Sequence, residues 1–382
     1  AGAAAPAAAQ SARLVLVAAA ALVRGASAGE AGKADVAAAA VEGAQRGANT
    51  GGISSAPNEI HVLVTSNGSP YLNFQTRIMY GTYKKVRDLP GSELRYFTRL
   101  LHRSDDDILM GEVPTVRVDP LTPKCDQWCE FPVSDRPDAV AKWLATDDAK
   151  EGTHVLMIET DYVWMKPISV PAEMAAGGAV SYSFSYISPS AQTHRMDKLW
   201  KTEFPDKEVP IKSVPPSGPA PALLRTADLR SITPYWVRFT AAIEADKALK
   251  DALGWVREMY AYSLAAAAAG VKHHTKAANA GGMLIAQPPS DTKPYQAAMY
   301  HYTWGTQFKN KTGKVVWEFD KRKYTAPEYV TNPRELELPP GDVEGLTQQF
   351  PRDGMAVDKD TRDTLADMIG RMNAVLRELP PL

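Results

Sequence analysis

The apolar and polar positions between Glu59 and Gly270 predict strands that alternate with helices. The segment EIHVLVTSNG, which begins at Glu59, is an apolar run that ends in small polar residues, as a buried strand does where it enters a loop. Apolar residues near helical spacing then follow at Phe74, Ile78, Met79, Tyr83 and Val86. A strand, a polar loop and a helix form the opening unit of an α/β fold.

Comparable segments continue the alternation further along the chain. Strands are predicted at residues 96–102, 114–119, 154–159 and 179–187, and helices at residues 136–146, 222–249 and 252–270. Because strands alternate with helices, we expect an α/β domain over residues 58–345, with a mostly parallel central sheet flanked by helices.

The C-terminal part, residues 346–382, predicts a helical extension. Between Asp358 and Leu379 the apolar residues fall on one helical stripe. The stripe consists of Leu365, Met368, Ile369, Met372, Val375 and Leu376. We expect an amphipathic helix packed back on the domain; a helix that binds a partner is the alternative.

The first 57 residues differ in composition from the rest. Arg13 precedes an apolar run from Leu14 to Val23, and the small residues after it include Ala26-Ser27-Ala28, the A-x-A form of a signal-peptidase site. We expect a signal peptide or a short signal anchor over residues 1–28, with an alanine-rich disordered tail as the alternative. Residues 29–57 are rich in Ala, Gly, Ser and Asn, which predicts a flexible stem.

Charge and cysteine content narrow the classes of function. The 382 residues carry 43 basic and 44 acidic side chains, a net charge of −1, so we expect no nucleic-acid partner. No window approaches the roughly 20 apolar residues that a bilayer-spanning helix needs, which leaves the possible N-terminal anchor as the expected membrane contact. Cys125 and Cys129 lack a second Cys or His pair for a zinc site. They form a local disulfide or are two incidental thiols.

The segment HVLMIETDYVWMKP, residues 154–167, carries the clearest candidate chemistry. Its apolar strand ends at Glu159 and Asp161, which an extended backbone projects to one side because they lie two residues apart. If the strand is central and parallel, its carboxyl end faces the ligand crevice of an open α/β sheet. Paired carboxylates there suit a divalent cation that also holds substrate phosphates. The alternative is that the acids cap the next helix or pair with Lys166.

Two further segments contain candidate site residues. In residues 299–324, His301 could supply an imidazole ligand, and Trp304 and Trp317 could stack on a sugar or a nucleobase; a structural histidine is the alternative. In GWVREMYAY, Glu258 lies on a helix apolar enough to be buried, so it needs a partner or a function. It could orient an acceptor hydroxyl or take its proton. Alternatively, it is satisfied by a neighbour such as His273, His274 or Arg257.

Several blocks together resemble the green-lineage hydroxyproline O-arabinosyltransferases. They are HVLVTSNGSPYLNFQTRIMYGTYKKV, YFTRLLH, VPTVRVDPL, MIETDYVWMKP, LGWVREMYAYSLA, HYTWGTQF and WEFDKRKY, which occur in the order of the family and span roughly Glu59 to Pro340. The resemblance implies a GT-A-like nucleotide-sugar fold, a manganese ion or another divalent cation, and a place in the secretory pathway, in the Golgi or the ER lumen. The implied reaction moves L-arabinofuranose from UDP-β-L-arabinofuranose to 4-hydroxyproline, with retention of configuration, in a hydroxyproline-rich peptide or a cell-wall glycoprotein.

The resemblance also assigns roles to individual residues. Both acids of the family's E-P-D-H block are present as Glu159 and Asp161, and His301 matches its H-Y-T block, so these three are the implied metal ligands. With the β-linked donor that the resemblance implies, stabilising an oxocarbenium-like state is the alternative role of Glu258. The implied donor-binding residues are Thr65, Ser66, Gln75, Arg77, Arg99, Glu159 and Trp304. Arg77 and Arg99 could hold phosphates bidentately, or each could form an ion pair with a helix acid.

The sequence departs from the family at two places. The family's G-N-S-P block aligns with Gly218-Pro219-Ala220-Pro221, which loses two polar side chains, and Tyr162 replaces the histidine after the acids. These changes concern the sugar or the acceptor more than the fold. A relative that uses another UDP-sugar or a serine acceptor, such as a peptidyl-serine galactosyltransferase, and a non-catalytic binding protein therefore remain alternatives.

Overall fold

The computed structural model describes residues 57–126, 129–172, 174–276, 284–292 and 297–382. Residues 58–382 form one unit by their internal contacts. The leader predicted at 1–28 and nearly all of the stem predicted at 29–57 lie outside the described residues. Within the described ranges, no helix is both long enough and apolar enough to cross a bilayer.

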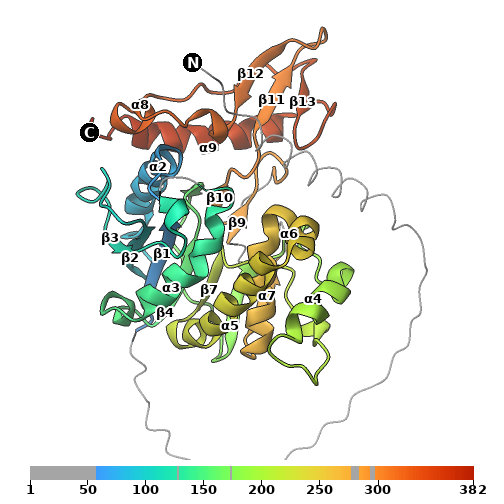
Figure 1. Cartoon of the computed structure of the whole chain (residues 1–382). Coiled ribbons are helices and arrows are strands. Elements are labelled where there is room, and N and C mark those ends of the chain that lie inside the picture. Colours follow the sequence, from blue (N-terminus) through green and yellow to red (C-terminus); the bar gives the residue numbers. More distant parts are fainter. Residues whose placement is uncertain (1–56, 127–128, 173, 277–283, 293–296) are drawn as a thin grey trace, which may run out of the picture. The chain divides into compact units, whose positions relative to one another are not determined.

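A seven-stranded sheet forms the centre of this unit, with the strand order β3-β2-β1-β4-β7-β6-β8. Figure 1 labels β1, β2, β3, β4 and β7 of this sheet. Its strands are β1 (Ile60–Ser66), β2 (Leu94–His102), β3 (Thr115–Val118), β4 (His154–Ile158), β6 (Gly178–Tyr182), β7 (Ala222–Arg225) and β8 (Lys272–Lys276). Only β7 runs antiparallel to its neighbours, β4 and β6. The predicted mostly parallel sheet is therefore confirmed.

The helices that accompany this sheet pack beside it and against one another. They are α2 (Pro70–Val86), α3 (Arg136–Leu144), α4 (Thr193–Trp200), α5 (Thr226–Ala245), α6 (Lys247–Leu253) and α7 (Arg257–Ala268). Helix α5 contacts both α3 and α7, as Figure 1 also shows. The mixed α/β class predicted from the alternation is confirmed.

Three predicted elements differ from the observed ones. The helix predicted at 252–270 is divided into the end of α6, a 3-10 helix at Gly254–Val256 and α7. Residues 222–225 begin the helix predicted at 222–249, but they form β7, because the apolar Ala222, Leu223 and Leu224 pair with β4 and β6 in the interior of the sheet. The strand predicted at 179–187 ends at Tyr182. Beyond it the Phe184 amide donates to the Pro216 carbonyl, outside the sheet.

The order of strands reverses next to β1. Helix α2 leads from β1 outward to β2, whereas α3 leads from β3 back across to β4, and β1 pairs in parallel with both β2 and β4. In open α/β sheets, ligands bind in the crevice at the carboxyl ends of strands where the order reverses. Here that position lies between Ser66, at the end of β1, and Ile158, at the end of β4.

Two small sheets extend from the main one. The first has the order β5-β10-β9, with β5 (Tyr162–Trp164), β9 (Ile285–Ala286) and β10 (Met299–His301). The second has the order β12-β11-β13, with β11 (Thr306–Lys309), β12 (Val315–Phe319) and β13 (Thr347–Gln349). Strand β13 belongs to the predicted C-terminal extension, and it pairs with β11, which belongs to the predicted domain. One sheet therefore crosses the boundary predicted between residues 345 and 346.

The chain ends with α8 (Glu328–Thr331) and α9 (Lys359–Leu376). Helix α9 buries Leu365, Met368, Ile369, Met372, Val375 and Leu376. It packs on α2, where a Cβ at Gly81 would lie 2.2 Å from Val375 Cγ1, so glycine permits this close approach. Asp358 caps its first turn by accepting from the Thr361 amide.

Cys125 and Cys129 form a disulfide, which is the first of the two alternatives that the sequence left open.

Candidate functional site

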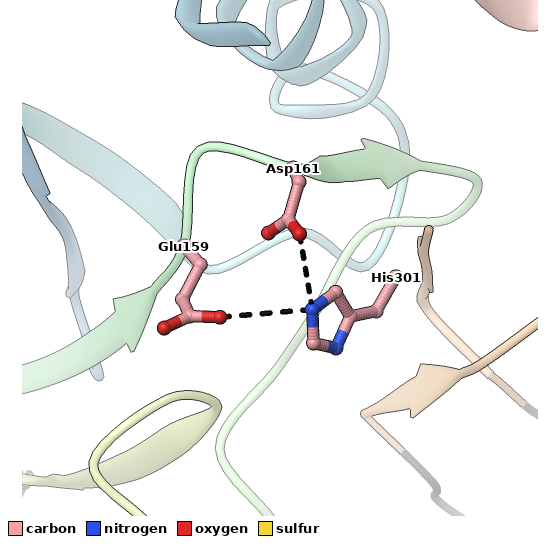
Figure 2. Close-up of side chains that lie close together, drawn as sticks. All are labelled: Glu159, Asp161 and His301. Carbon is pink, nitrogen blue, oxygen red and sulfur yellow. Dashed lines mark ion pairs between the residues drawn. The ribbon is translucent and has the colours of Figure 1, made fainter. Parts of the chain in front are cut away.

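Glu159, Asp161 and His301 lie together at the carboxyl end of β4. His301 Nε2 is 3.3 Å from Asp161 Oδ2 and 3.6 Å from Glu159 Oε2, and Figure 2 shows both carboxylates directed at this nitrogen. One ligand atom from each residue lies within 4.8 Å of the others. Two carboxylates and an imidazole are a donor set that fits a divalent cation such as manganese. The three predicted ligands are thus brought to one point.

The local strand pairing explains why a histidine so distant in sequence reaches the two acids. After β4 the chain passes through Glu159 and Asp161 into β5, which pairs antiparallel with β10, with Tyr162 opposite His301. The Tyr302 amide also donates to the Asp161 carbonyl, at 3.3 Å. The Tyr162 ring lies 4.6 Å from the His301 ring, so the tyrosine that follows the two acids packs against this candidate ligand.

Two half-buried cations, Arg136 and Lys321, neutralise the acids, and neither was predicted. Arg136, at the start of α3, lies 2.8 Å from Glu159 Oε1 and 3.4 Å from Glu258 Oε2, and its Nε donates to Thr65 Oγ1. Lys321 donates from its Nζ to Asp161 Oδ2. The helix dipole disfavours a cation in the first turn, so an arginine there is a weak sequence signal for a role outside the helix. Lys321 belongs to the block WEFDKRKY, in which its position alone does not distinguish it from its basic neighbours.

Glu258 is buried in the first turn of α7, and Arg136 connects it to Glu159. Burial raises the pKa of its carboxyl to about 7; Arg136 opposes this rise and Glu159 adds to it. Two of the three alternative partners proposed from the sequence, Arg257 and His273, are engaged elsewhere. Arg257 pairs with Glu244 at 2.5 Å, and His273 lies 2.9 Å from Ser181 Oγ. Glu258 therefore belongs to the same charged cluster as the acids of β4.

The remaining polar candidates lie beside this cluster or behind it. Thr65 contacts Arg136, whereas Ser66 is buried and accepts from the Gly68 amide. Gln75 accepts from Thr160 Oγ1 at 2.7 Å, which places it behind the turn that carries the acids. These contacts fix the loop after β1 and the turn after β4.

The two tryptophans of residues 299–324 differ in accessibility. Trp304 is half-buried, and its ring lies 6.4 Å from the Tyr186 ring in a perpendicular arrangement. Trp317 is buried and donates to the Glu337 carbonyl. Its ring packs on Phe308 of β11, so it serves the core of the small sheet. Trp304 is accordingly the better placed of the two for stacking on a ligand.

Arg77 and Arg99 each form an ion pair, which was the alternative to phosphate binding, but their partners are acids of the loop between β2 and β3 and not helix acids. Arg77 Nη2 lies 2.7 Å from Glu112 Oε2, and its guanidinium also donates to the carbonyls of Val330 and Pro380. Arg99 Nη2 lies 2.6 Å from Asp107 Oδ1. Both side chains are buried, and their contacts give them a structural part, with Arg77 joining α2 to the C-terminal residues.

Replacing Arg77 should therefore weaken the fold rather than nucleotide binding. We expect Arg77→Met to lower the free energy of unfolding by about 3–5 kcal/mol, because it leaves Glu112 and two carbonyls without their partner. Urea unfolding measures this loss. Arg87→Met is the matched control, since its ion pair with Asp88 is exposed and worth about 1 kcal/mol or less. A stable Arg77→Met protein that no longer binds uridine diphosphate would restore the donor-binding prediction.

Comparisons with known proteins agree on one family. The model of the hydroxyproline O-arabinosyltransferase family N-terminal domain matches residues 60–275. The hydroxyproline O-arabinosyltransferase PLENTY of Lotus japonicus is 35% identical over 297 residues, which cover 76% of this chain and 78% of that protein. Hydroxyproline O-arabinosyltransferase 3 of Arabidopsis thaliana is 35% identical over 295 residues, covering 76% and 77%. The peptidyl serine alpha-galactosyltransferase of Arabidopsis thaliana is 24% identical over 314 residues, covering 76% and 36%.

Proposed function

Because the chain belongs to the hydroxyproline O-arabinosyltransferase family and is a glycosyltransferase, we propose that it transfers L-arabinofuranose from UDP-β-L-arabinofuranose to 4-hydroxyproline. The acceptor would be a hydroxyproline-rich peptide or a cell-wall glycoprotein. The observation that carries the proposal is the convergence of Glu159, Asp161 and His301 at the carboxyl end of β4, beside the reversal of strand order. This is where a GT-A-like fold, which we also propose, would bind a nucleotide sugar.

Glu159, Asp161 and His301 would hold a divalent cation, for which we propose manganese. When bound, the ion would stabilise the charge that develops on the departing diphosphate. The residues around it have distinct tasks. Arg136 orients Glu159 and Glu258 through its two ion pairs, and the Tyr162 ring supports His301.

Glu258 is the carboxylate we propose to act on the acceptor. With a pKa of about 7 it can accept a proton near neutral pH, which suits a group that takes the proton of the hydroxyproline hydroxyl. In a reaction that retains configuration, the ionised carboxylate would instead stabilise an oxocarbenium-like sugar. Either task requires Glu258 beside the donor, and its link through Arg136 to Glu159 supports that position.

A different sugar or acceptor is the second candidate, and one observation favours it. Pro219 and Ala220, which stand where the family has Asn and Ser, line a small cavity together with Thr65 and Arg136. The lost polar groups therefore border the charged cluster. One relative is named a peptidyl serine alpha-galactosyltransferase, so UDP-galactose and a serine peptide are the matched alternatives to test.

The proposal is tested with residues 58–382, a hydroxyproline-rich peptide and UDP-β-L-arabinofuranose, with manganese or with a chelator. We expect the peptide to gain the mass of one pentose only with manganese, and the same peptide with proline in place of hydroxyproline to gain nothing. A hexose gained from UDP-galactose would establish the second candidate instead. Uridine diphosphate binding with no transfer from either donor would contradict both. The secretory location, in the Golgi or the ER lumen, is tested by imaging a tagged full-length chain in plant cells.

A further inference from the structure

The segment WEFDKRKY directs one of its three consecutive basic residues into the site. Lys321–Lys323 form a 3-10 helix after β12, capped by Asp320. The Arg322 side chain is 51% exposed and pairs with Asp320, and the Lys323 side chain is 62% exposed and pairs with Glu318. The Lys321 side chain is only 16% exposed, and its ammonium contacts Asp161. The fold therefore delivers one cation to the candidate metal ligands and keeps its neighbours at the surface.

The ammonium of Lys321 contacts the same oxygen that His301 faces. Asp161 Oδ2 accepts from Lys321 Nζ and lies 3.3 Å from His301 Nε2. A divalent cation bound between these two ligands would share Oδ2 with a positive charge at contact distance, which is strongly repulsive in a buried site. The cation and the ammonium in its observed position therefore exclude each other.

The two half-buried cations, Arg136 and Lys321, differ in how firmly they are held. Arg136 has three partners, Glu159, Glu258 and Thr65, and it keeps two of them if Glu159 turns to a metal. For Lys321, Asp161 is the single ion-pair partner found among the described residues. Once Asp161 binds a metal, Lys321 needs a new anion, because an unpaired buried charge is costly.

The charges show which anion fits. In the observed site the charges of Glu159 and Asp161 are balanced by Arg136 and Lys321. A divalent cation alone adds two positive charges to this partly buried cluster, and a bridging diphosphate adds two negative charges, so the two together restore neutrality. Lys321, released from Asp161, is then the cation within reach of the phosphate oxygens, and ammonium groups bind phosphates well.

We propose that Lys321 is a positioning residue that exchanges partners: it neutralises Asp161 in the empty site and binds the donor diphosphate when a divalent cation takes Asp161. This rests on the proposed function, because it assumes a nucleoside diphosphate donor. Its consequence is that the cation and the diphosphate bind cooperatively. Each alone binds weakly, since the metal alone must displace the ammonium and the diphosphate alone must approach two carboxylates.

The test compares Lys321→Met with Lys323→Met in the full chain. Binding of Mn²⁺ is measured by the electron paramagnetic resonance signal of the free ion, with and without uridine diphosphate, and nucleotide binding by calorimetry. We expect Lys321→Met to bind Mn²⁺ alone about tenfold more tightly, and to bind uridine diphosphate with Mn²⁺ about tenfold or more weakly. Lys323→Met, a surface lysine of the same helix, should match the wild type.

The outcomes separate this inference from the proposed function. Wild-type cooperativity that Lys321→Met leaves unchanged would overturn the role of Lys321 and leave the proposed function standing. A wild-type chain that binds neither Mn²⁺ nor uridine diphosphate would overturn both. If Lys321→Met is too unstable to assay, Lys321→Arg decides: it keeps the charge, so cooperative binding should persist, and its loss in a folded Lys321→Arg protein with normal Mn²⁺ binding would contradict exchange onto phosphate.

Discussion

The Asp161→Asn variant is expected to lose metal-dependent turnover by a factor of about 10³ or more, because one candidate ligand loses its charge and several kcal/mol of charge stabilisation go with it. It is also expected to lose stability. The buried Asp161 neutralises the half-buried Lys321, so removing its charge leaves an ammonium without a counter-ion, at a cost of about 3 kcal/mol. Transfer assays with manganese and urea unfolding measure the two losses.

A second substitution separates the two effects of Asp161→Asn. Adding Lys321→Met removes the unpaired ammonium, so the double variant should recover most of the stability and none of the turnover. Asp197→Asn is the matched control, since Asp197 of α4 pairs with the exposed Lys201 at the end of that helix, and its loss should change neither stability nor activity appreciably. Full turnover by Asp161→Asn would contradict the assignment of Asp161 as a metal ligand.

The Glu258→Gln variant is expected to retain the binding of uridine diphosphate with manganese and to lose turnover by about 10²–10⁴-fold, the usual contribution of a general base. Wild-type turnover should rise with pH through about 7 as Glu258 ionises, because burial raises the pKa of this carboxyl. Glutamine cannot titrate, so the variant should lack this step. A pH-rate profile of both proteins measures it, and an unchanged profile in Glu258→Gln would exclude Glu258 as the base.

The same carboxyl should make stability depend on pH. Its pKa is 4.5 in the unfolded chain and about 7 in the folded one, so both states are protonated below pH 4.5. Between these values the unfolded chain releases its proton and the folded chain keeps it, which lowers the free energy of unfolding as the pH rises. Above pH 7 the carboxyl is ionised in both states, and the free energy of unfolding stops falling. The total decrease is about 3 kcal/mol at most.

Glu258→Gln removes the contribution of this carboxyl to the pH dependence of the unfolding free energy. Urea unfolding at several pH values can detect the change. The difference in unfolding free energy between variant and wild type should shift in favour of the variant between pH 4.5 and 7, and stay constant above. If the difference is the same at every pH, the folded pKa of Glu258 is not raised. This readout is independent of turnover, so it tests the burial of Glu258 even if its role in catalysis is different.

The core of the fold could be predicted from the order of residues alone. Strands β1 and β4 are continuous apolar runs that the sheet buries, and α2 begins at Pro70 after the capping Ser69, both of which local patterns indicate. Strand β8, with the sequence KHHTK, carries no such pattern because it forms an edge of the sheet. Strand β7 was predicted as the start of a helix from its local pattern. Pairing with its neighbours in the sheet, and not local propensity, decides its conformation.

The sequence by itself determined which residues end the central strand: Glu159 and Asp161 follow an apolar run, and that spacing is a local property of an extended chain. Only the tertiary structure decided what surrounds them. Strand pairing between β5 and β10 brings in His301, α3 supplies Arg136, and the turn after β12 supplies Lys321. Arg77 and Arg99 were assigned to phosphates from the family blocks. Arg77 is held instead by Glu112 and by carbonyls of distant segments, and Arg99 by Asp107 in the loop after its own strand. The charge of a side chain follows from its residue type, whereas its ion-pair partner depends on which segments the fold brings into contact.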